Sequence, residues 1–458
     1  VLNNYGKHFI IGFTAQYRGY QNYGYIGLSI LAPYDTNITI FSRKRSAPLN
    51  YTTHIKGGEV FEYKLPVSLR MEGTGKQMNG IEILSTNNIS VLCLNHYSTS
   101  ADGYLALPTN TLGLTYVTAS YQPYNSDSRA NLAIISAYEN NTITFVLSKS
   151  AVVKYRGLLY DKGTPLLYAT LALEKLEALH ISGLSDLSGT IVLASKPVVV
   201  ISGVDRASPS GSKGSYDMLE SFLLPTSLWG KQYILTTVRT SDKKKGDVFR
   251  IFAYENNTVV ENAYWTKVLS SGSYTELKLE ENLASFVTCS NPCQVIQYIR
   301  GESVDGKYAD PSMIVLPSVS QFVSYYRVVL PYGSQYFDSI TIVIKNEYSE
   351  GLYLNEIQIT GAEWKKINGT NYVWRVVSFS NQNSVIVYHT SSAVKFGLLV
   401  FGWNNGVSYA YPGGLALSNF SNGKLFSFQI IFCVSLFTEQ LKCFKYRTCS
   451  RLFVRSAK

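Results

Sequence analysis

The chain is poor in charged residues and in the patterns that catalysis usually requires. Only 16% of its 458 residues are charged, against an average of about 25%. The five histidines are dispersed, with no His-x-His pair and no His-Glu-x-x-His sequence to place two metal ligands on one helix face. No Gly-x-Ser-x-Gly sequence is present to expose a nucleophilic serine. We therefore expect no metal site, no cofactor and no enzymatic activity.

The chain also lacks a long apolar segment. Its best candidate, residues 425–437, spans 13 residues and is interrupted by Ser427, Gln429 and Ser435, whereas a helix needs about 20 residues to cross a bilayer. We expect no membrane insertion. Residues 419–458 carry seven basic residues against one glutamate, so six of the ten net positive charges lie there. The remaining charge is ordinary and predicts no nucleic-acid partner.

These 40 residues differ from everything before them. We interpret residues 419–458 as a basic tail outside the domain, for instance a translated intron, and a membrane-surface anchor is the alternative. The chain begins at Val1 in mid-pattern, so a signal peptide can have preceded it. Separately, we expect the chain to be part of a larger multidomain protein.

Four stretches of the chain repeat one pattern in one order. Each opens with a short apolar run and, about 25 residues later, reaches a turn; the second and third turns both read Ala-Tyr-Glu-Asn-Asn-Thr. Each of the first three closes with a buried-looking strand, a polar segment and a Leu-Pro pair. A period of about 100 residues predicts four modules. Their predicted boundaries are 1–112, 113–229, 230–320 and 321–418.

Within each module the pattern is that of β-strands. Ile26, Leu28 and Ile30 alternate with smaller residues, which is typical of a strand with one buried face. Leu171, Leu173, Leu176 and Leu179 come close to the leucine stripe of a helix, but the place of residues 174–183 in the repeat favours a strand. The sequence thus predicts an all-β chain of about four tandem β-sandwich-like modules. A single β-propeller, with two blades in each module, is the alternative.

Two local features predict covalent modification. Cys289 and Cys293 flank an Asn-Pro turn, which favours a disulfide bond in a secreted β-protein, although Cys293 can also pair elsewhere. Cys93 lies in an apolar run and is expected to be a buried free thiol. Asn-x-Ser/Thr sequences that can accept a glycan occur at Asn37, Asn50, Asn88, Asn140, Asn256, Asn368 and Asn419.

The closing segment of the second module carries a resemblance to a known family. Residues 189–203, followed by Leu223-Leu224-Pro225 and Trp229-Gly230, resemble the N-terminal domain of IgGFc-binding proteins, and the Ala-Tyr-Glu-Asn-Asn-Thr turns belong to the same resemblance. It implies an extracellular binding or adhesive module of secreted, mucin-associated or surface proteins. It does not carry Fc binding over to this chain, because no Fc-contacting residue matches a position here.

Function follows as three hypotheses. We expect a non-enzymatic binding and adhesion module for extracellular glycoproteins, mucins or cell-surface glycans. A carbohydrate-active hydrolase and a structural spacer of a larger mucus or surface protein are the alternatives. Polar segments after the buried strands, at 95–105, 203–216, 300–310 and 403–414, are expected to be recognition loops. A simple crossover between the two sheets is the alternative. In the second of them we predict that Asp205, Arg206 and Tyr216 form the main contact surface.

Overall fold

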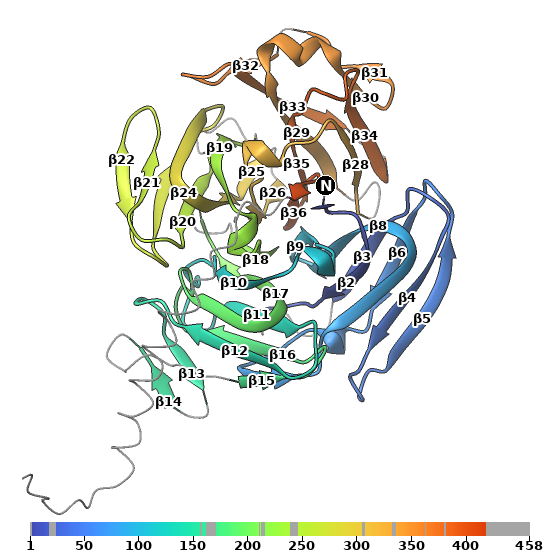
Figure 1. Ribbon diagram of the computed structural model, residues 1–458, viewed down its shortest axis with the longest axis vertical. Coiled ribbons are helices and arrows are strands. Elements are labelled where there is room, and N and C mark those ends of the chain that lie inside the picture. The colour runs from blue at the N-terminus through green and yellow to red at the C-terminus, as the bar shows by residue number, and fades with distance from the viewer. Residues whose placement is uncertain are drawn as a thin grey trace, which may run out of the picture. The chain divides into compact units, whose positions relative to one another are not determined.

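We analysed a computed structural model of the chain (Figure 1). It describes residues 2–17, 24–155, 158–161, 171–209, 211, 216–238, 246–304, 307–331, 336–361, 363–379 and 382–417. The predicted tail, with Asn419 and the last three cysteines, lies outside these residues.

Module 1 consists of two antiparallel sheets that share one long strand. Strand β8 (Ile81–Tyr97) pairs through its first half with β2 (Gly6–Ile11) and β4 (Thr36–Ser42), and through its second half with β3 (Gly24–Leu31) and β9 (Ser100–Leu105). Outer strands β5 (Leu49–Ile55) and β6 (Val60–Leu65) extend the two sheets. The module also contains η2 (Val67–Leu69) and β7 (Gly75–Gln77). A single strand therefore joins the two layers of a sandwich-like unit.

Modules 2 and 3 repeat this plan. In module 2 the shared strand is β17 (Ile191–Ala207), which pairs with β10 (Gly113–Val117), β12 (Asn141–Val146), β11 (Ala130–Ser136) and β18 (Asp217–Phe222). Its remaining strands are β13 (Val153–Tyr155), β14 (Leu158–Tyr160), β15 (Leu171–Leu173) and β16 (Ala178–Gly183). In module 3 the shared strand is β24 (Ala284–Ile299), which pairs with β19 (Gly230–Thr236), β20 (Val248–Ala253), β21 (Thr258–Glu261) and β27 (Ser312–Val315). Its remaining strands are β22 (Thr266–Leu269), β23 (Tyr274–Lys278), β25 (Glu302–Val304) and β26 (Lys307–Ala309).

Module 4 has two separate sheets instead of one shared strand. One contains β28 (Tyr325–Val329), β34 (Ser384–His389), β30 (Leu352–Leu354) and β31 (Ile357–Gln358). The other contains β32 (Lys365–Lys366), β33 (Tyr372–Phe379), β29 (Phe337–Lys345), β35 (Gly397–Asn404) and β36 (Val407–Pro412). A short 3₁₀ segment, η7 (Asn346–Gly351), follows β29. The predicted all-β, sandwich-like fold is confirmed. Residues 174–183 form a turn and strand β16 rather than a helix, also as predicted.

The same bulge interrupts each shared strand where it passes from one sheet to the other. Gly6 of β2 pairs with Ile89 of β8, but His8 pairs with Leu84. Strand β8 therefore has more residues than β2 between these two pairs. Equivalent register shifts separate the paired positions of β10 with β17 and of β19 with β24. A bulge bends and twists a strand locally. It therefore allows one strand to serve two sheets that face each other.

The Leu-Pro pairs of the repeat lie at the junctions between modules. Each is followed by a short 3₁₀ turn: η3 (Thr109–Thr111), η4 (Thr226–Leu228) or η5 (Val319–Gln321). The opening glycine of each of the first two modules packs on the proline at the following junction. A Cβ atom placed on Gly113 would lie 2.4 Å from the Cβ atom of Pro225, and one on Gly6 would lie equally close to Pro108. The repeated glycine is therefore required by a close approach between segments.

A buried tyrosine fastens the first strand of modules 2, 3 and 4. The hydroxyl of Tyr116 donates to the carbonyl of Val198 (2.6 Å) and accepts from the backbone N–H of Gly113 (3.0 Å). Tyr233 and Tyr326 make the same two kinds of bond in their own modules. Phe9, which lacks a hydroxyl, occupies the corresponding place in module 1.

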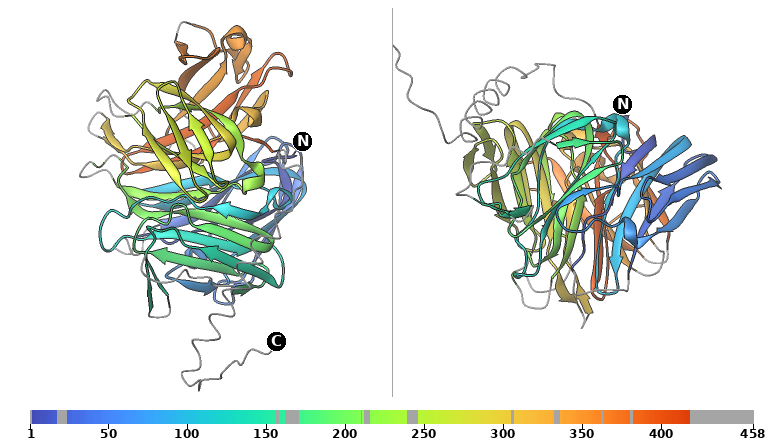
Figure 2. Two further views of the ribbon diagram at one scale, coloured as in Figure 1. Left: turned by 60° about the vertical axis from the view of Figure 1, so that its left-hand side comes forward. Right: turned by 90° about the horizontal axis from the view of Figure 1, so that it is seen from below.

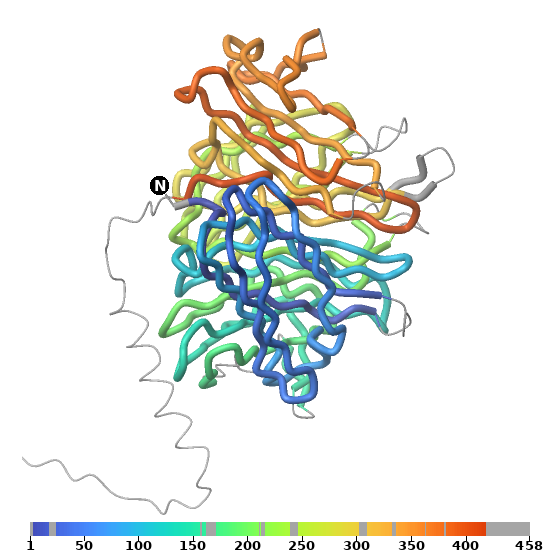
Figure 3. The backbone as a smooth tube through the Cα atoms, turned by 90° about the vertical axis from the view of Figure 1, so that its right-hand side faces the viewer, coloured from blue at the N-terminus to red at the C-terminus, as the bar shows by residue number. Residues whose placement is uncertain are grey.

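Neighbouring modules share their hydrophobic cores. One cluster of buried side chains draws mainly on modules 1 and 2, and another combines module 4 with residues of module 1 such as Leu92 and Leu94. The modules lie side by side, as the green and yellow strands of modules 2 and 3 show in Figures 1 and 2. Strand β1 (Leu2–Asn3) pairs with the last described strand, β37 (Ala416–Leu417), beside which the N-terminus is drawn in Figure 3. The module boundaries themselves stay a prediction.

Two of the four segments expected to be polar loops, 95–105 and 403–414, are largely strands, so the prediction was wrong for them. In the described part of 203–216 the strand ends at Ala207, and 300–310 contains the paired strands β25 and β26. Strand β8 continues to Tyr97 and β9 begins at Ser100, while β35 and β36 are separated only by residues 405–406. The returning strands β9, β18, β27 and β36 contact one another in the order β9, β18, β27, β36 and back to β9. They are therefore interior elements rather than surface loops.

Buried hydrogen bonds explain why polar residues occur in these returning strands. The carboxylate of Asp102 is fully buried and accepts backbone N–H groups of Gly103 (2.9 Å), Glu220 (3.0 Å) and Met313 (3.0 Å). It thereby connects the returning strands of modules 1, 2 and 3. A buried polar group is tolerated when it is hydrogen-bonded in this way. Composition alone suggested solvent exposure because these partners come from distant modules.

Candidate binding surface

Arg206 lies within a cluster of three tyrosine rings. Its guanidinium carbon is 3.6 Å from the ring centre of Tyr216, 4.7 Å from that of Tyr17 and 5.3 Å from that of Tyr124. The rings of Tyr124 and Tyr216 are themselves 4.6 Å apart. A guanidinium within about 6 Å of an aromatic ring centre is attracted by the ring's negative face. The four side chains, which we call the Arg206 cluster, therefore hold one another in place.

The Arg206 cluster is built by two modules. Arg206 is near the end of β17, Tyr216 directly precedes β18, and Tyr124 follows β10 in module 2, whereas Tyr17 comes from module 1. The backbone N–H of Tyr124 donates to the carbonyl of Arg206 (2.9 Å), which fixes the loop against the strand. Tyr124 is 39% exposed, and Arg206, Tyr216 and Tyr17 are half-buried. Tyrosine and arginine side chains at this exposure are typical of binding hot spots.

Two of the acidic residues that the sequence placed in this region are buried. Asp205, 3% exposed, accepts the backbone N–H of Arg129 through Oδ1 (2.7 Å), so it supports the strand end rather than facing solvent. Asp217 accepts the backbone N–H of Ala101 (3.0 Å). Burial, together with the nearby carboxylate of Asp310, raises the pKa of Asp217 well above its usual range. The structure therefore brings Arg206 and Tyr216 together and buries Asp205. Sequence reasoning missed Tyr17 and Tyr124.

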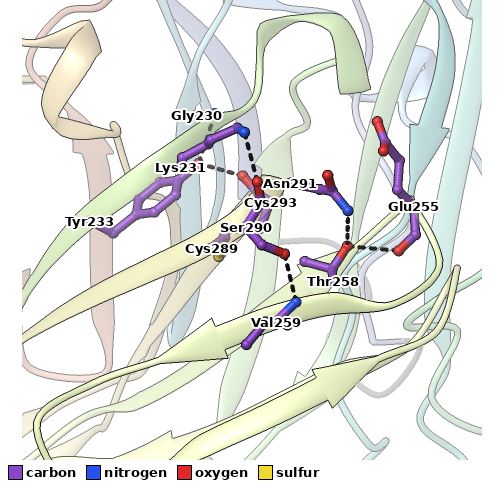
Figure 4. The surroundings of a disulfide bond; sticks show 10 residues. All are labelled: Gly230, Lys231, Tyr233, Glu255, Thr258, Val259, Cys289, Ser290, Asn291 and Cys293. Atoms are coloured by element: carbon purple, nitrogen blue, oxygen red, sulfur yellow. Dashed lines mark hydrogen bonds between the residues drawn. A yellow bond between two sulfur atoms is a disulfide. The ribbon is translucent and has the colours of Figure 1, made fainter.

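The predicted disulfide between Cys289 and Cys293 is present in the structure (Figure 4). It spans the bulge of β24, opposite the first strand of module 3. The hydroxyl of Ser290 accepts the backbone N–H of Val259 (2.8 Å), and the amide of Asn291 donates to the hydroxyl of Thr258 (3.3 Å). The bulge is thus held by both a covalent bond and side-chain hydrogen bonds. Cys93 is a buried free thiol, as predicted, and burial raises its pKa.

The candidate glycan acceptors within the described residues are all exposed. They are Asn37, Asn50, Asn88, Asn140, Asn256 and Asn368. Asn140 adopts a left-handed backbone (φ +51°), which is common for asparagine in turns. The side-chain oxygen of Asn256 accepts the backbone N–H of Ser271 (2.9 Å). Their exposure makes them accessible to glycosylation.

The carboxylates that recur in the repeat belong to separate turns. Asp35 accepts the backbone N–H of Gly57 (2.7 Å), and Glu139 accepts that of Lys175 (3.0 Å). Glu139 also bonds to Glu174 and to Arg43, and the hydrogen bond with Glu174 is the main reason why its pKa is lowered to about 2. These residues shape turns.

The described part of the chain contains no group of three His, Cys, Asp or Glu side chains arranged to bind a metal ion. Histidines in these residues bond to groups of the protein itself. His8 bonds to the carboxylate of Glu82 (2.7 Å), and the buried His180 bonds to the carbonyl of Gly73 (2.5 Å). Within the same residues, no helix has the length and apolarity needed to span a membrane.

Comparison with known proteins identifies the family. A family model described as "IgGFc binding protein" matches residues 102–402, which is more than half of the chain. The chain belongs to the IgGFc-binding protein family. The match begins at Asp102 and extends through the shared strands β17 and β24, the junction turns and the disulfide described above, so the family pattern covers modules 2 and 3 and most of module 4.

A human IgGFc-binding protein is 22% identical to this chain over 418 residues. The alignment covers 89% of this chain but only 7% of the human protein, so the chain corresponds to a small part of that relative. Among solved structures, a major pilin of Streptococcus pyogenes (8% identity, TM-score 0.14, 67% of this chain and 98% of that one) and titin domains A168–A170 (8% identity, TM-score 0.12, 66% and 98%) show only slight likeness.

Proposed function

We propose that this chain is an extracellular, non-enzymatic binding and adhesion module that engages glycoproteins, mucins or cell-surface glycans. The observation that carries the proposal is the Arg206 cluster, in which two modules present tyrosine rings and a guanidinium group at the surface. Tyrosine supplies contact area at low entropic cost, and arginine adds hydrogen-bond donors. Membership of the IgGFc-binding protein family supports a binding role. The proposal does not include Fc binding.

The scaffold beneath the cluster suits recognition. Asp205 ties the end of β17 to Arg129, and the backbone of Tyr124 is bonded to Arg206. Side chains held by such contacts lose little freedom when a partner binds, and this lowers the entropic cost of association. A spacer would not require a preorganised cluster of this composition.

The test measures how strongly immobilised mucin captures residues 1–458, and it compares the wild-type chain with its variants. Replacing Arg206 and Tyr216 with Ala removes the centre of the cluster, and we expect capture to weaken by at least about 30-fold, as for hot-spot residues worth about 2 kcal/mol. Asp205 is left unchanged because its substitution would disturb the strand end. The matched control replaces Arg45 and the 81% exposed Tyr264, which lie elsewhere.

The outcomes separate the candidate functions. Undiminished capture by the Arg206/Tyr216 variant, with an unchanged circular dichroism spectrum, would refute the role of the cluster. No capture by the wild-type chain would favour the structural spacer. Release of sugars from the mucin by the wild-type chain would favour the hydrolase.

A further inference from the structure

A second surface feature lies away from the Arg206 cluster, at the contact between modules 2 and 3. It is a groove of about 740 Å³, within the usual size of small-ligand sites. One wall is formed by residues 146–151 and by Tyr160 and Asp161 of module 2, and the opposite wall is the turn 270–274 of module 3. Ser188, Gly189 and Ile191 complete the lining.

Two glycines bring the backbones of the modules together in this groove. A Cβ atom on Gly189 would lie 2.2 Å from the carbonyl oxygen of Gly272, and one on Gly272 would lie 2.9 Å from that of Gly189. Both residues also have positive φ angles, +85° and +72°, which glycine adopts without strain. No larger residue fits at either position without displacing the other module. This part of the groove is therefore lined by backbone.

The lining is rich in hydroxyl groups and nearly neutral. Six serines contribute to it, together with two tyrosines, one lysine and one aspartate. The hydroxyl of Ser188 is bonded to Ser120 and Arg250, and that of Ser273 donates to the carbonyl of Ser270. The serine hydroxyls that we assign to the ligand are therefore those of Ser148, Ser150, Ser270 and Ser271. Lys149 and Asp161 are exposed and opposite in charge. A serine hydroxyl both donates and accepts hydrogen bonds, which matches the hydroxyls of a sugar. A tyrosine ring offers an apolar face with a polar edge, which matches the C–H face of a sugar.

The wall that carries Tyr274 is held rigidly by Arg250. The guanidinium of Arg250 lies 4.6 Å from the ring centre of Tyr274 and bonds to Asp186 (2.7 Å) and to the hydroxyl of Ser188 (3.0 Å) across the module boundary. Arg250 also bonds to Glu276 (3.1 Å). Groups positioned in advance by such a network bind with a smaller loss of entropy.

We propose that this groove, hereafter the serine groove, binds a short neutral oligosaccharide of a glycoprotein partner. The inference rests on the proposed function and assigns a second, chemically different contact to it. Its lining combines hydroxyl groups with apolar side chains such as Leu147 and Ile191, as the two kinds of surface on a sugar require, and its single exposed lysine does not suit a highly acidic ligand. Asn256 is bonded through its side chain to the backbone of Ser271 in the groove wall, so a sugar attached there would begin beside the groove.

The experiment uses residues 1–458, treated with an N-glycosidase to remove any sugar attached at Asn256, and a panel of neutral and sialylated tri- and tetrasaccharides of galactose, N-acetylglucosamine and fucose. We expect at least one neutral sugar to bind. Ser150→Trp with Ser271→Trp should fill the groove, and Tyr160→Ala should remove a ring. Each variant should weaken binding at least about tenfold, measured by saturation-transfer NMR and calorimetry. Ser46→Trp, at an exposed turn of module 1, is the matched control.

The Arg206/Tyr216 variant separates this inference from the proposed function, because it should still bind the neutral sugar while losing capture by mucin. Mucin capture that depends on Arg206, with no neutral sugar bound by a folded wild-type chain, would overturn the serine groove alone. Equal sugar binding by the Ser150/Ser271, Tyr160 and Ser46 variants would also overturn it, as would binding restricted to sialylated sugars. Loss of sugar binding in both groove variants, but not in the Ser46 variant, supports the assignment.

Discussion

Replacing Glu220 with glutamine should change how the stability of this protein depends on pH. Glu220 is fully buried in β18. Its Oε1 accepts the backbone N–H and the hydroxyl of Thr14 (2.6 and 2.7 Å), and its Oε2 accepts the amide of Asn95 (3.2 Å). Burial nevertheless dominates and raises its pKa from 4.5 to about 7. The folded protein therefore retains this proton at pH values where the unfolded chain releases it.

The sign and size of the effect follow from this difference. The stabilising contribution is fully present below about pH 4.5 and is lost as the pH rises through 7, because only the unfolded chain ionises freely in that interval. Each pKa unit corresponds to about 1.4 kcal/mol. Between pH 5 and pH 8 the wild-type protein should thus lose about 3 kcal/mol of unfolding free energy through Glu220. The amide introduced by Glu220→Gln does not titrate, so the variant should lack this loss.

Urea denaturation of both proteins at pH 5, 6, 7 and 8 provides the measurement. At pH 5 we expect the variant to be less stable by about 1 kcal/mol, because its amide group faces the donor amide of Asn95. At pH 8 it should be more stable than the wild type by about 2 kcal/mol. Glu59→Gln, at an exposed carboxylate, serves as the control. A stability difference between wild type and the Glu220 variant that stays constant across these pH values would refute the reasoning.

Three further changes test the scaffold. Serine at both Cys289 and Cys293 should lower the unfolding free energy by about 2 kcal/mol, and mass mapping under non-reducing alkylation should find these two thiols protected in the wild type. Gly113→Ala should cost about 1–3 kcal/mol, because the new methyl group meets Pro225 at 2.4 Å; an unchanged melting temperature would contradict this close approach. Deleting residues 420–458 should leave the melting temperature unchanged, and a large decrease would show that the tail packs on the body.

Much of the fold could be predicted from the sequence because its signals are local. Alternating residues such as Ile26, Leu28 and Ile30 determine strands, since successive side chains of a strand point to opposite faces. Repetition of one pattern indicates one structural plan. The place of residues 174–183 in the repeat therefore predicted a strand, despite the helix-like leucine spacing in this part of the chain. The Asn-Pro turn between Cys289 and Cys293 brings the two thiols together within five residues, so this disulfide was predictable as well.

Tertiary structure alone decided what lies between modules. Polar returning strands such as β9 are interior because Asp102 finds its hydrogen-bond donors on β18 and β27, and sequence composition cannot locate partners over 100 residues away. Arg206 and Tyr216 were predictable from one segment, but Tyr17 joins them only when module 1 packs on module 2. Likewise, Gly189 and Gly272 line one groove because two modules meet there. Local residue patterns determine each module, whereas contacts between modules determine the surfaces on which we expect binding.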